Sequence, residues 1–516
     1  KNIIMKKLFY FLSLTALFTA CDDSLEPFTP GAVYEDVAVR SYNDLNRLMN
    51  NSMNIMTNRE EYSFTSIFTD EAAPGTDNGG QGISGSDAYY SYFLNPSSFA
   101  PEAIWSSNYN AMAQINLILE NVDDAIVRDP NNEALLIRLK AEAKIMRALA
   151  HLKVLAYFST DLTNDAALAG IIADRTFLYT EQPPRATVGD TYDFIHQDLN
   201  DAIDIYDNNT LPAVSNNSFF PTRTLALALK ARAYAYKKDY VNAEIWADQA
   251  IAAGVALATR TQLASVFHTS NAPATTEVIF KFRRTIQQNN QGTNLHNGWV
   301  SVDNTINGSC FYEVSRGLYN ALVAAPGTDA RTSIIVGPTS LIDPNYATSP
   351  NVRDSDILVP FKHGGASART SANRFNPDFV QVRVSEMYFI KAEARAAESD
   401  YTGVANALKQ ITDRRFVTPP ALLVLTTDQQ AWKAILDERR KELAFEGHRF
   451  IDLKRLYSVA GVTSFDRHPS DYDPASLNFP GGNPANFNFT NNTKWALPIP
   501  FVELNANGSF GQNPGY

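Results

Sequence analysis

The sequence predicts a mostly α-helical fold in which paired helices carry a loop-rich part with few short strands. Apolar residues recur at helical spacing over several long segments, most clearly at residues 105–122 and 131–158. A helix-pair pattern also occurs twice, at positions far apart in the chain. Three long irregular segments, rich in Asn, Gly, Pro and aromatic residues, lie at 270–312, 325–382 and 458–516. Their many aromatic residues argue against disorder and indicate ordered loops.

The first forty residues are expected to lie outside this fold. Lys6 and Lys7 precede the short apolar run LFYFLSLTALFTA, so residues 1–20 have the layout of a secretory signal that is too short to span a bilayer. Small residues directly before Cys21 are typical of a bacterial lipoprotein signal, in which the cysteine becomes the first mature residue and carries acyl chains. Residues 21–40 then form a lipid-anchored tether. A buried N-terminal helix with an incidental cysteine is the alternative.

The helical pattern begins after the tether and is interrupted by one long polar stretch. In this stretch, residues 69–100, Gly, Ser, Asn and Asp surround three tyrosines. A short strand is expected within a later irregular segment, at Val278 to Phe282. The predicted helices cover residues 41–57, 105–122, 131–158 and 189–206, and a helix pair covers 222–253.

The helix pair at 222–253 has the spacing of a tetratricopeptide repeat, with small residues where two helices approach closely and tyrosine in the next layer. The same pattern returns at 385–411, where Asp400-Tyr401 repeats Asp239-Tyr240, although Val404 replaces a small residue. Two partial repeats separated by a long insertion predict a helical scaffold that irregular segments interrupt. The residues that fit the repeat in the first pair are Leu227, Ala231, Tyr234, Tyr240, Ala243, Ala247 and Ala250.

The densest charged stretch, residues 437–456, predicts a charged helix that meets a second helix. Glu438, Glu442 and Glu446 recur every four residues, with basic residues between them. Such pairs are expected on the helix surface, where each contributes only a few tenths of a kcal/mol. Gly447 is expected to end this helix in a left-handed cap.

The composition excludes some functions. The formal net charge is −11, and removal of the predicted signal takes away three lysines and no acid, which leaves about −14. A nucleic-acid partner needs a basic face, so none is expected. Hydrophobic residues make up 45% of the chain, enough for a substantial core. If Cys21 is acylated, Cys310 is the single remaining cysteine and an internal disulfide is excluded.

No catalytic motif stands out in the sequence. The histidines lack the spacing of a zinc hydrolase, and no nucleophile elbow, phosphate-binding loop or dinucleotide fingerprint is present. The sequence therefore predicts a protein that is not an enzyme and uses no cofactor, and it identifies no metal-binding residues, while the presence of a structural metal is left open. A glycoside hydrolase needs only two carboxylates without fixed spacing, so that activity remains an alternative.

The stretch ERRKELAFEGHRFIDLKR closely resembles the C-terminal signature of the SusD/RagB family of surface lipoproteins. Further family motifs follow one another in the expected order, and the resemblance spans the whole mature chain. They are IWSSNYNAMAQINLILENV (104–122), AEAKIMRALAHLKVLAYF (141–158), RVSEMYFIKAEARA (383–396) and TKWALPIPFVELNAN (493–507). The resemblance implies about four tetratricopeptide-like helix pairs in a right-handed superhelical scaffold. It also implies an N-terminal part at 41–270 and a C-terminal part with long loops at 271–516.

The resemblance also implies a function. A member of this family is expected to be anchored in the outer membrane by its lipid and exposed at the cell surface. It would capture oligo- or polysaccharide and deliver it to a SusC-like TonB-dependent transporter, without catalysis. Capture of peptides or glycopeptides by the same fold is the alternative.

A shallow sugar site needs exposed aromatic rings for the C–H faces of the sugar and polar side chains for its hydroxyls. The loops supply both kinds of residue. Packing within the loops is the alternative explanation for each ring. The predicted ligand-contacting or adjacent residues are Asp70, Tyr89 and Tyr90 in one loop, Trp299, Cys310 and Tyr312 in a second, Arg374 in a third, and Asp44 and Asn46 near the first helix start.

Overall fold

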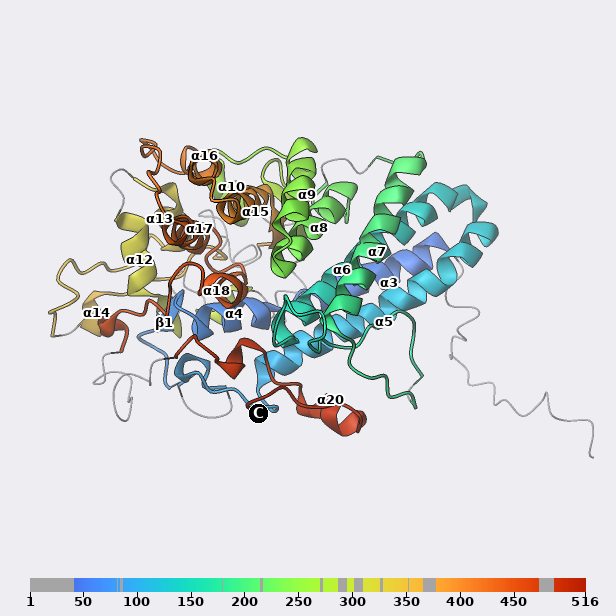
Figure 1. Ribbon diagram of the computed structural model, residues 1–516, viewed down its shortest axis with the longest axis horizontal. Coiled ribbons are helices and arrows are strands. Elements are labelled where there is room, and N and C mark those ends of the chain that lie inside the picture. The colour runs from blue at the N-terminus through green and yellow to red at the C-terminus, as the bar shows by residue number, and fades with distance from the viewer. Residues whose placement is uncertain are drawn as a thin grey trace, which may run out of the picture.

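The computed structural model describes most of the chain after the predicted tether, and helices dominate it (Figure 1). Two pairs of short strands accompany the helices, so the predicted mostly α-helical fold with few short strands is confirmed. The residues described are 41–80, 82–83, 87–178, 180–213, 217–269, 272–285, 295–300, 310–324, 328–350, 352–364, 377–472 and 487–516.

The long helices of the N-terminal half pack side by side, with α5 against both α3 and α6, and α7 against α6. Helices α3, α5, α6 and α7 lie on the right of Figure 1. All the helices predicted for this half are present, and α5 extends beyond its predicted range at both ends. These helices are α3 (Tyr42–Ile55), α4 (Arg59–Phe68), α5 (Phe99–Arg128), α6 (Glu133–Phe158), α7 (Val188–Asn208), α8 (Arg223–Lys237) and α9 (Tyr240–Ala252).

The C-terminal helices complete the scaffold, and α15, α16 and α17 lie at the upper left of Figure 1. Helix α15 packs against α9, so the two predicted repeats are direct neighbours in space. The long helices here are α15 (Val384–Ala397), α16 (Tyr401–Thr412), α17 (Asp428–Glu442) and α18 (Arg449–Leu456). The short helices are α10 (Leu263–Phe267), α12 (Arg316–Val323), α13 (Ala330–Ile335), α14 (Val352–Ser355) and α20 (Phe501–Ala506). The 3-10 turns of both halves are η1 (Tyr89–Ser91), η2 (Pro130–Asn132), η3 (Leu295–Gly298), η4 (Pro469–Tyr472) and η5 (Thr493–Trp495).

The repeated Asp-Tyr dipeptide has the same structural role in both helix pairs. Lys238 and Ser399 adopt the left-handed conformation, with φ of 62° and 55°, and end the first helix of each pair. The following Asp239 and Asp400 then cap the second helix, because each side chain accepts a hydrogen bond from a backbone N–H in the first turn. A local turn therefore explains why this dipeptide recurs.

Two antiparallel strand pairs join segments that are distant in the sequence. Strand β1 (Ala72–Pro74) pairs with β3 (Tyr312–Val314), and β2 (Val278–Phe282) pairs with β4 (Phe379–Arg383). The bounds of β2 are those predicted from the sequence. Strand β4 leads directly into α15, so the β2–β4 pair is fixed to the helical scaffold.

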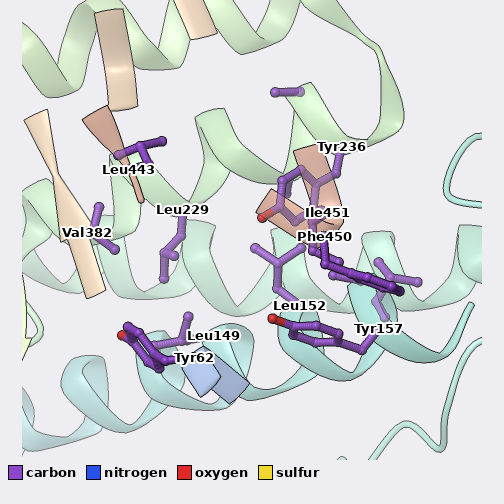
Figure 2. Packing of buried hydrophobic residues seen from close by; sticks show 14 of the residues in the cluster. Tyr62, Leu149, Leu152, Tyr157, Leu229, Tyr236, Val382, Leu443, Phe450 and Ile451 are labelled. Atoms are coloured by element: carbon purple, nitrogen blue, oxygen red, sulfur yellow. The ribbon is translucent and has the colours of Figure 1, made fainter. Parts of the chain in front are cut away.

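One hydrophobic core extends through both halves of the described chain (Figure 2). Helix α18 lies against α4 and brings Phe450 onto the N-terminal helices, where its ring stacks on Tyr157 of α6 at a centroid distance of 5.9 Å. In the same region, Tyr62 of α4 and Leu149 of α6 face Leu229 of α8. The halves are therefore held together by shared apolar burial.

The prediction of a charged surface helix at 437–456 is wrong in two respects. Helix α17 ends at Glu442, earlier than predicted, although Gly447 has the expected positive φ of 82°. Its charges are also buried: the exposed fractions of Glu438, Glu442 and Glu446 are 7%, 3% and 6%. The physical reason is that their partners include arginines and a lysine from other segments, which replace the water that a surface helix would have.

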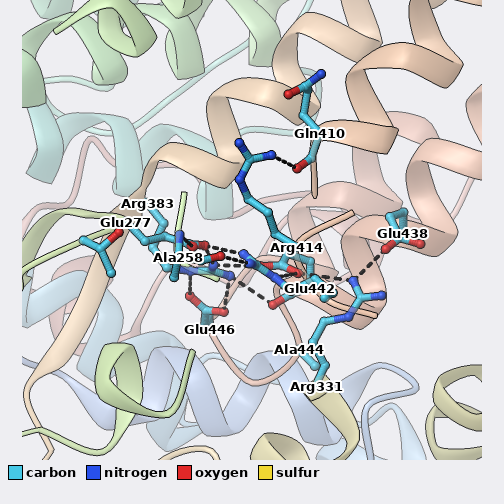
Figure 3. A network of polar contacts seen from close by, with 12 residues as sticks. Ala258, Glu277, Arg331, Arg383, Gln410, Arg414, Glu438, Glu442, Ala444 and Glu446 are labelled. Carbon is cyan, nitrogen blue, oxygen red and sulfur yellow. Dashed lines mark hydrogen bonds and ion pairs between the residues drawn. The ribbon is translucent and has the colours of Figure 1, made fainter. Parts of the chain in front are cut away.

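These partners form a buried cluster of ion pairs (Figure 3). Glu442 accepts hydrogen bonds from Arg415 at 2.8 Å and from Arg383 at 2.9 Å. Glu446 accepts two from Arg383, both at 2.8 Å, and one from Lys362 at 2.6 Å. Burial alone would raise the pKa of Glu446, but Arg383 and Lys362 lower it to about 2.

Glu277, which directly precedes β2, completes this cluster. Its carboxylate pairs with both Arg383 and Arg415, the latter at 2.7 Å. Arg331 of α13 joins the edge of the cluster through Glu438 and Glu442 at 2.6 and 3.2 Å. We call this set the Glu442–Glu446 cluster; its members are Glu277, Arg331, Lys362, Arg383, Arg415, Glu438, Glu442 and Glu446.

Replacing Glu446 with Gln is expected to lower the free energy of unfolding at pH 7 by about 3–5 kcal/mol, because Arg383 and Lys362 would lose a buried counter-charge. Denaturant unfolding followed by circular dichroism measures this loss. Glu398→Gln is the control, because the Glu398 side chain is 55% exposed, and it should change stability by less than about 0.5 kcal/mol.

The same comparison has a pH signature. A carboxyl whose pKa is lower in the folded state stabilises the fold above its unfolded pKa and loses that contribution as the pH falls through its folded pKa. The difference between wild type and Glu446→Gln should therefore shrink between pH 4.5 and pH 2. A difference that stays constant over this range would contradict the assignment.

Candidate functional site

The two loops that were predicted to form the ligand site do lie next to each other. Strand pairing of β1 with β3 continues beyond the strands, where the Gly75 N–H donates to the Phe311 carbonyl at 2.8 Å. The Asn78 side-chain amide donates to the same carbonyl at 2.7 Å. The structure therefore brings residues 75–78 together with residues 310–314. Residues 286–294 and 301–309 lie outside the described part.

Asp70 was predicted to contact a ligand from an exposed loop, but the predicted exposure of its side chain is wrong. The side chain is fully buried, and both carboxylate oxygens accept from Arg449, at 2.7 and 2.8 Å. Burial acts to raise the pKa of Asp70, but Arg440 and Arg449 hold it well below its usual range. Asp70 therefore fixes the end of α4 to the start of α18.

Tyr89 and Tyr90 are also buried, against the prediction of exposed rings. The Tyr89 hydroxyl donates to Asp87 at 2.6 Å and accepts from the Ala100 N–H at 2.8 Å. The Tyr90 ring lies under the guanidinium of Arg467, at 3.8 Å from the ring centroid. Both rings therefore hold their loop against the rest of the protein.

The second loop shows the same correction. Trp299 is 1% exposed; its indole N–H donates to the Ser66 hydroxyl at 2.7 Å, and its ring stacks on His363 at a centroid distance of 5.7 Å. Cys310 and Tyr312 are buried beside it, where the Tyr312 N–H donates to the Trp299 carbonyl at 2.9 Å. Trp299 is buried because its ring packs among Ser66 of α4, His363 and Phe445. Loop packing was the alternative.

The remaining predicted contacts are less constrained. Asp44 belongs to a capping box at the start of α3, where its carboxylate accepts from the N–H and hydroxyl of Ser41 at 3.1 and 2.7 Å. Asn46 is half-buried in the same helix. Arg374 and Cys21 lie outside the described residues. Ligand contact by Asp44, Asn46 and Arg374 and lipidation of Cys21 stay predictions.

A hollow of about 660 Å³ lies elsewhere among the described residues. It is formed by the last turns of α3, by residues 217–220 before α8, and by the end of β2 with the residues that follow it. We call it the α3–β2 cleft. Its described lining consists of Asn50, Met53, Asn54, Asn217, Phe219, Phe220, Pro273, Phe282, Arg283 and Thr285.

The lining of the α3–β2 cleft suits a sugar. Phenylalanine rings offer apolar faces for sugar C–H groups, and asparagine amides both donate and accept hydrogen bonds to hydroxyls. Two cations lie near Phe219, with the Lys281 ammonium 5.1 Å and the Arg283 guanidinium carbon 5.8 Å from its ring centroid. Phe219 and Phe220 are half-buried, so part of each ring is accessible.

A second hollow of about 340 Å³ shares Asn217 with the cleft. Its described lining includes Tyr206, Asn209, Arg223 and Val278. Arg223 pairs with Asp207 at 2.6 Å. Both hollows therefore border the segment 217–220.

Sequence reasoning missed the cleft because four separate segments build it. Two signals were present: Asn50 and Asn54 are spaced to share one face of α3, and Phe219-Phe220 follow a polar, asparagine-containing segment. Neither signal identifies the other segment across the cleft, so their combination was visible only in the structure.

Within the described ranges, no group of three or more His, Cys, Asp or Glu residues is arranged to hold a metal ion. No helix in the same ranges has the length and apolar character needed to cross a membrane.

Comparison with known proteins finds two family models. The model described as SusD family matches residues 340–516, and the model described as starch-binding associating with outer membrane matches residues 33–235. No curated protein sequence matches the chain.

Solved structures resemble the chain over nearly its whole length. A SusD superfamily protein from Bacteroides thetaiotaomicron superposes with a TM-score of 0.70 at 21% identity, covering 92% of this chain and 100% of its own. A SusD-like carbohydrate binding protein from Bacteroides vulgatus gives 0.69 at 18%, covering 91% and 97%. A laminarin binding SusD-like protein gives 0.64 at 21%, covering 92% and 100%. At these identities the likeness establishes the fold.

Replacing Trp299 with Ala is expected to act on stability, because the buried indole packs among Ser66 of α4, His363 and Phe445. A loss of about 3–5 kcal/mol in the free energy of unfolding is expected, as for other buried tryptophans. Thermal and denaturant unfolding measure it. Unchanged stability combined with lost ligand binding would contradict the structural role and restore Trp299 as an exposed ligand contact.

Proposed function

The chain belongs to the SusD/RagB family, and we propose that it captures oligo- or polysaccharide at the cell surface and delivers it to a SusC-like TonB-dependent transporter. The family is one of non-catalytic carbohydrate-binding proteins. The observation that supports the proposal most strongly is the match of two family models to opposite parts of the chain, residues 33–235 and 340–516.

The α3–β2 cleft supports carbohydrate as the ligand class and is the proposed capture site. Ligand sites are concave and combine apolar rings with a few polar groups that fix orientation. The cleft has this composition in Phe219, Phe220 and the three asparagines. Solved relatives described as carbohydrate binding and laminarin binding are consistent with the same class of ligand.

We further propose that lipid on Cys21 anchors the protein in the outer membrane. The apolar run before this cysteine has the layout of a lipoprotein signal, and the matching N-terminal family model is described as associating with outer membrane. The acidic net charge of −11 disfavours adhesion to anionic lipid through charge alone, so a covalent anchor would supply the attachment.

Residues 22–516 are expected to bind at least one soluble polysaccharide in affinity electrophoresis, with calorimetry on each polysaccharide that retards the protein. Phe219→Ala and Phe220→Ala should weaken that binding by about tenfold, because each removes an aromatic face. Phe501→Ala is the matched control, since Phe501 is 53% exposed on α20 and lies outside the cleft lining.

Thermal unfolding of each variant separates lost binding from lost folding. Binding that survives both cleft substitutions would move the site elsewhere. Binding of a peptide mixture in the absence of any glycan binding would replace carbohydrate by peptide as the ligand.

The full lipidated chain is expected to co-purify with a TonB-dependent transporter when it is extracted from its native outer membrane in mild detergent. The reason is that delivery requires the binding protein to remain at the entrance of the transporter. Mass spectrometry of the purified complex identifies the partner. A Cys21→Ser chain tests the anchor, because it should no longer fractionate with the membrane. Isolation of the lipidated chain alone under several detergents would contradict the proposed partnership.

A further inference from the structure

The second hollow lies next to the α3–β2 cleft, and we call it the α8–β2 hollow. It is bordered by the end of α7, the start of α8, the end of α9 and the start of β2. Its volume of about 340 Å³ falls within the usual range of small-molecule sites. Asn217 lines both hollows, so a ligand that extends past this residue passes from one hollow to the other.

Strand β2 relates the two hollows in space. Val278 and Ile279 at its start line the α8–β2 hollow, whereas Phe282 at its end lines the cleft. Successive residues of a strand rise by about 3.3 Å, so four residues along β2 cover about 13 Å. Pairing with β4 holds the strand in place. The floors of the two hollows therefore have a fixed separation, which is longer than a disaccharide and shorter than a hexasaccharide.

The segment shared by the two hollows is also held in place. The Lys281 N–H donates to the Ser218 carbonyl at 2.8 Å, and the Ala274 N–H donates to the Ser218 hydroxyl at 2.9 Å. The side-chain oxygen of Asn217 accepts from the Phe219 N–H at 3.2 Å. The amide nitrogen of Asn217 has no hydrogen-bond partner in the described part of the chain, so it is available to a ligand at the junction.

The α8–β2 hollow has the chemistry of a site for uncharged sugar units. The hydroxyls of Thr222 and Thr224 have no hydrogen-bond partner within the described ranges, and they can donate to or accept from sugar hydroxyls. Arg223, the charged residue of the described lining, pairs with Asp207 at 2.6 Å. The aliphatic residues of β2 provide an apolar floor for sugar C–H groups.

We propose that the α8–β2 hollow is a second glycan subsite, and that one linear, uncharged oligosaccharide occupies both the cleft and the hollow by passing Asn217. This inference rests on the proposed function of glycan capture and specifies its substrate class as chains longer than a disaccharide. A single chain that reaches both hollows gains the second set of contacts without a second loss of translational freedom.

Oligosaccharides of increasing length test the proposal on residues 22–516. Calorimetry measures the binding of laminari-, malto-, cello- and xylo-oligosaccharides from the disaccharide to the hexasaccharide. In a series that binds, the hexasaccharide should bind at least about tenfold more tightly than the disaccharide. Because chain length can also raise affinity at a single site, variants are needed to show which hollow supplies the gain.

Ala253→Trp is the decisive variant. Ala253 is exposed at the end of α9 and lines the α8–β2 hollow, which the larger side chain would occupy. The substitution should weaken hexasaccharide binding about tenfold and leave disaccharide binding in the cleft unchanged. Ala252→Trp is the matched control, because Ala252 is the exposed neighbouring residue and lies outside both linings. The control should keep both affinities.

Thr224→Val is a milder variant that removes one hydroxyl and keeps the shape of the side chain. It should weaken hexasaccharide binding alone, by about threefold, as expected for the loss of one hydrogen bond. Thr210→Val is its control, since Thr210 is exposed just after α7 and lies outside both linings. Unchanged thermal unfolding of all four variants confirms that they are folded.

The outcomes separate this inference from the proposed function. Hexasaccharide binding that survives both Ala253→Trp and Thr224→Val would overturn the second subsite and leave glycan capture intact. Loss of disaccharide binding in Ala253→Trp would also overturn it, because the hollow would then be the principal site. If only a polysaccharide binds, unchanged retardation of Ala253→Trp in affinity electrophoresis would overturn it. Absence of binding to any glycan would overturn glycan capture as well.

Discussion

The buried ion pairs of the Glu442–Glu446 cluster are the contacts on which the arrangement of the remaining elements depends. Removing a charge from water costs several kcal/mol unless its partners are in place, so all segments that supply them must meet. Arg383 comes from the end of β4, Arg415 from the turn after α16, and Glu277 from the residue before β2. The cluster therefore fixes the start of β2, whose other end forms one wall of the α3–β2 cleft.

The sequence predicted the elements well where local chemistry decides them. Helical periodicity located the long helices, and the repeated Asp-Tyr dipeptide identified two helix pairs because an aspartate cap is a local interaction. Local pattern failed at α17, where Glu438 and Glu442 have the spacing of surface charges. Their burial depends on arginines that come from other segments, such as Arg331 and Arg415, and periodicity carries no information about such partners.

The candidate site was harder to predict, for a related reason. Loop composition indicated an irregular backbone rich in aromatic rings, but it did not indicate what covers those rings. The Tyr90 ring is covered by Arg467. The Arg467 guanidinium is held in this position because it donates to the Thr69 and Tyr90 carbonyls. The α3–β2 cleft was not predicted, because the segments that form its walls carry no distinctive motif. Only the fold brings Asn54 and Phe219 to the same hollow.

These contacts divide the molecule into parts with different tolerance to change. Substitutions at Trp299 or Asp70 disturb buried partners and are constrained by stability. Residues 217–220 and 283–285 line the cleft outside the Glu442–Glu446 cluster, while β2 holds the second of these segments through its pairing with β4. A binding site supported in this way keeps its geometry when lining side chains change. The ligand preference of such a protein can therefore change at Phe219 or Arg283 without loss of the fold.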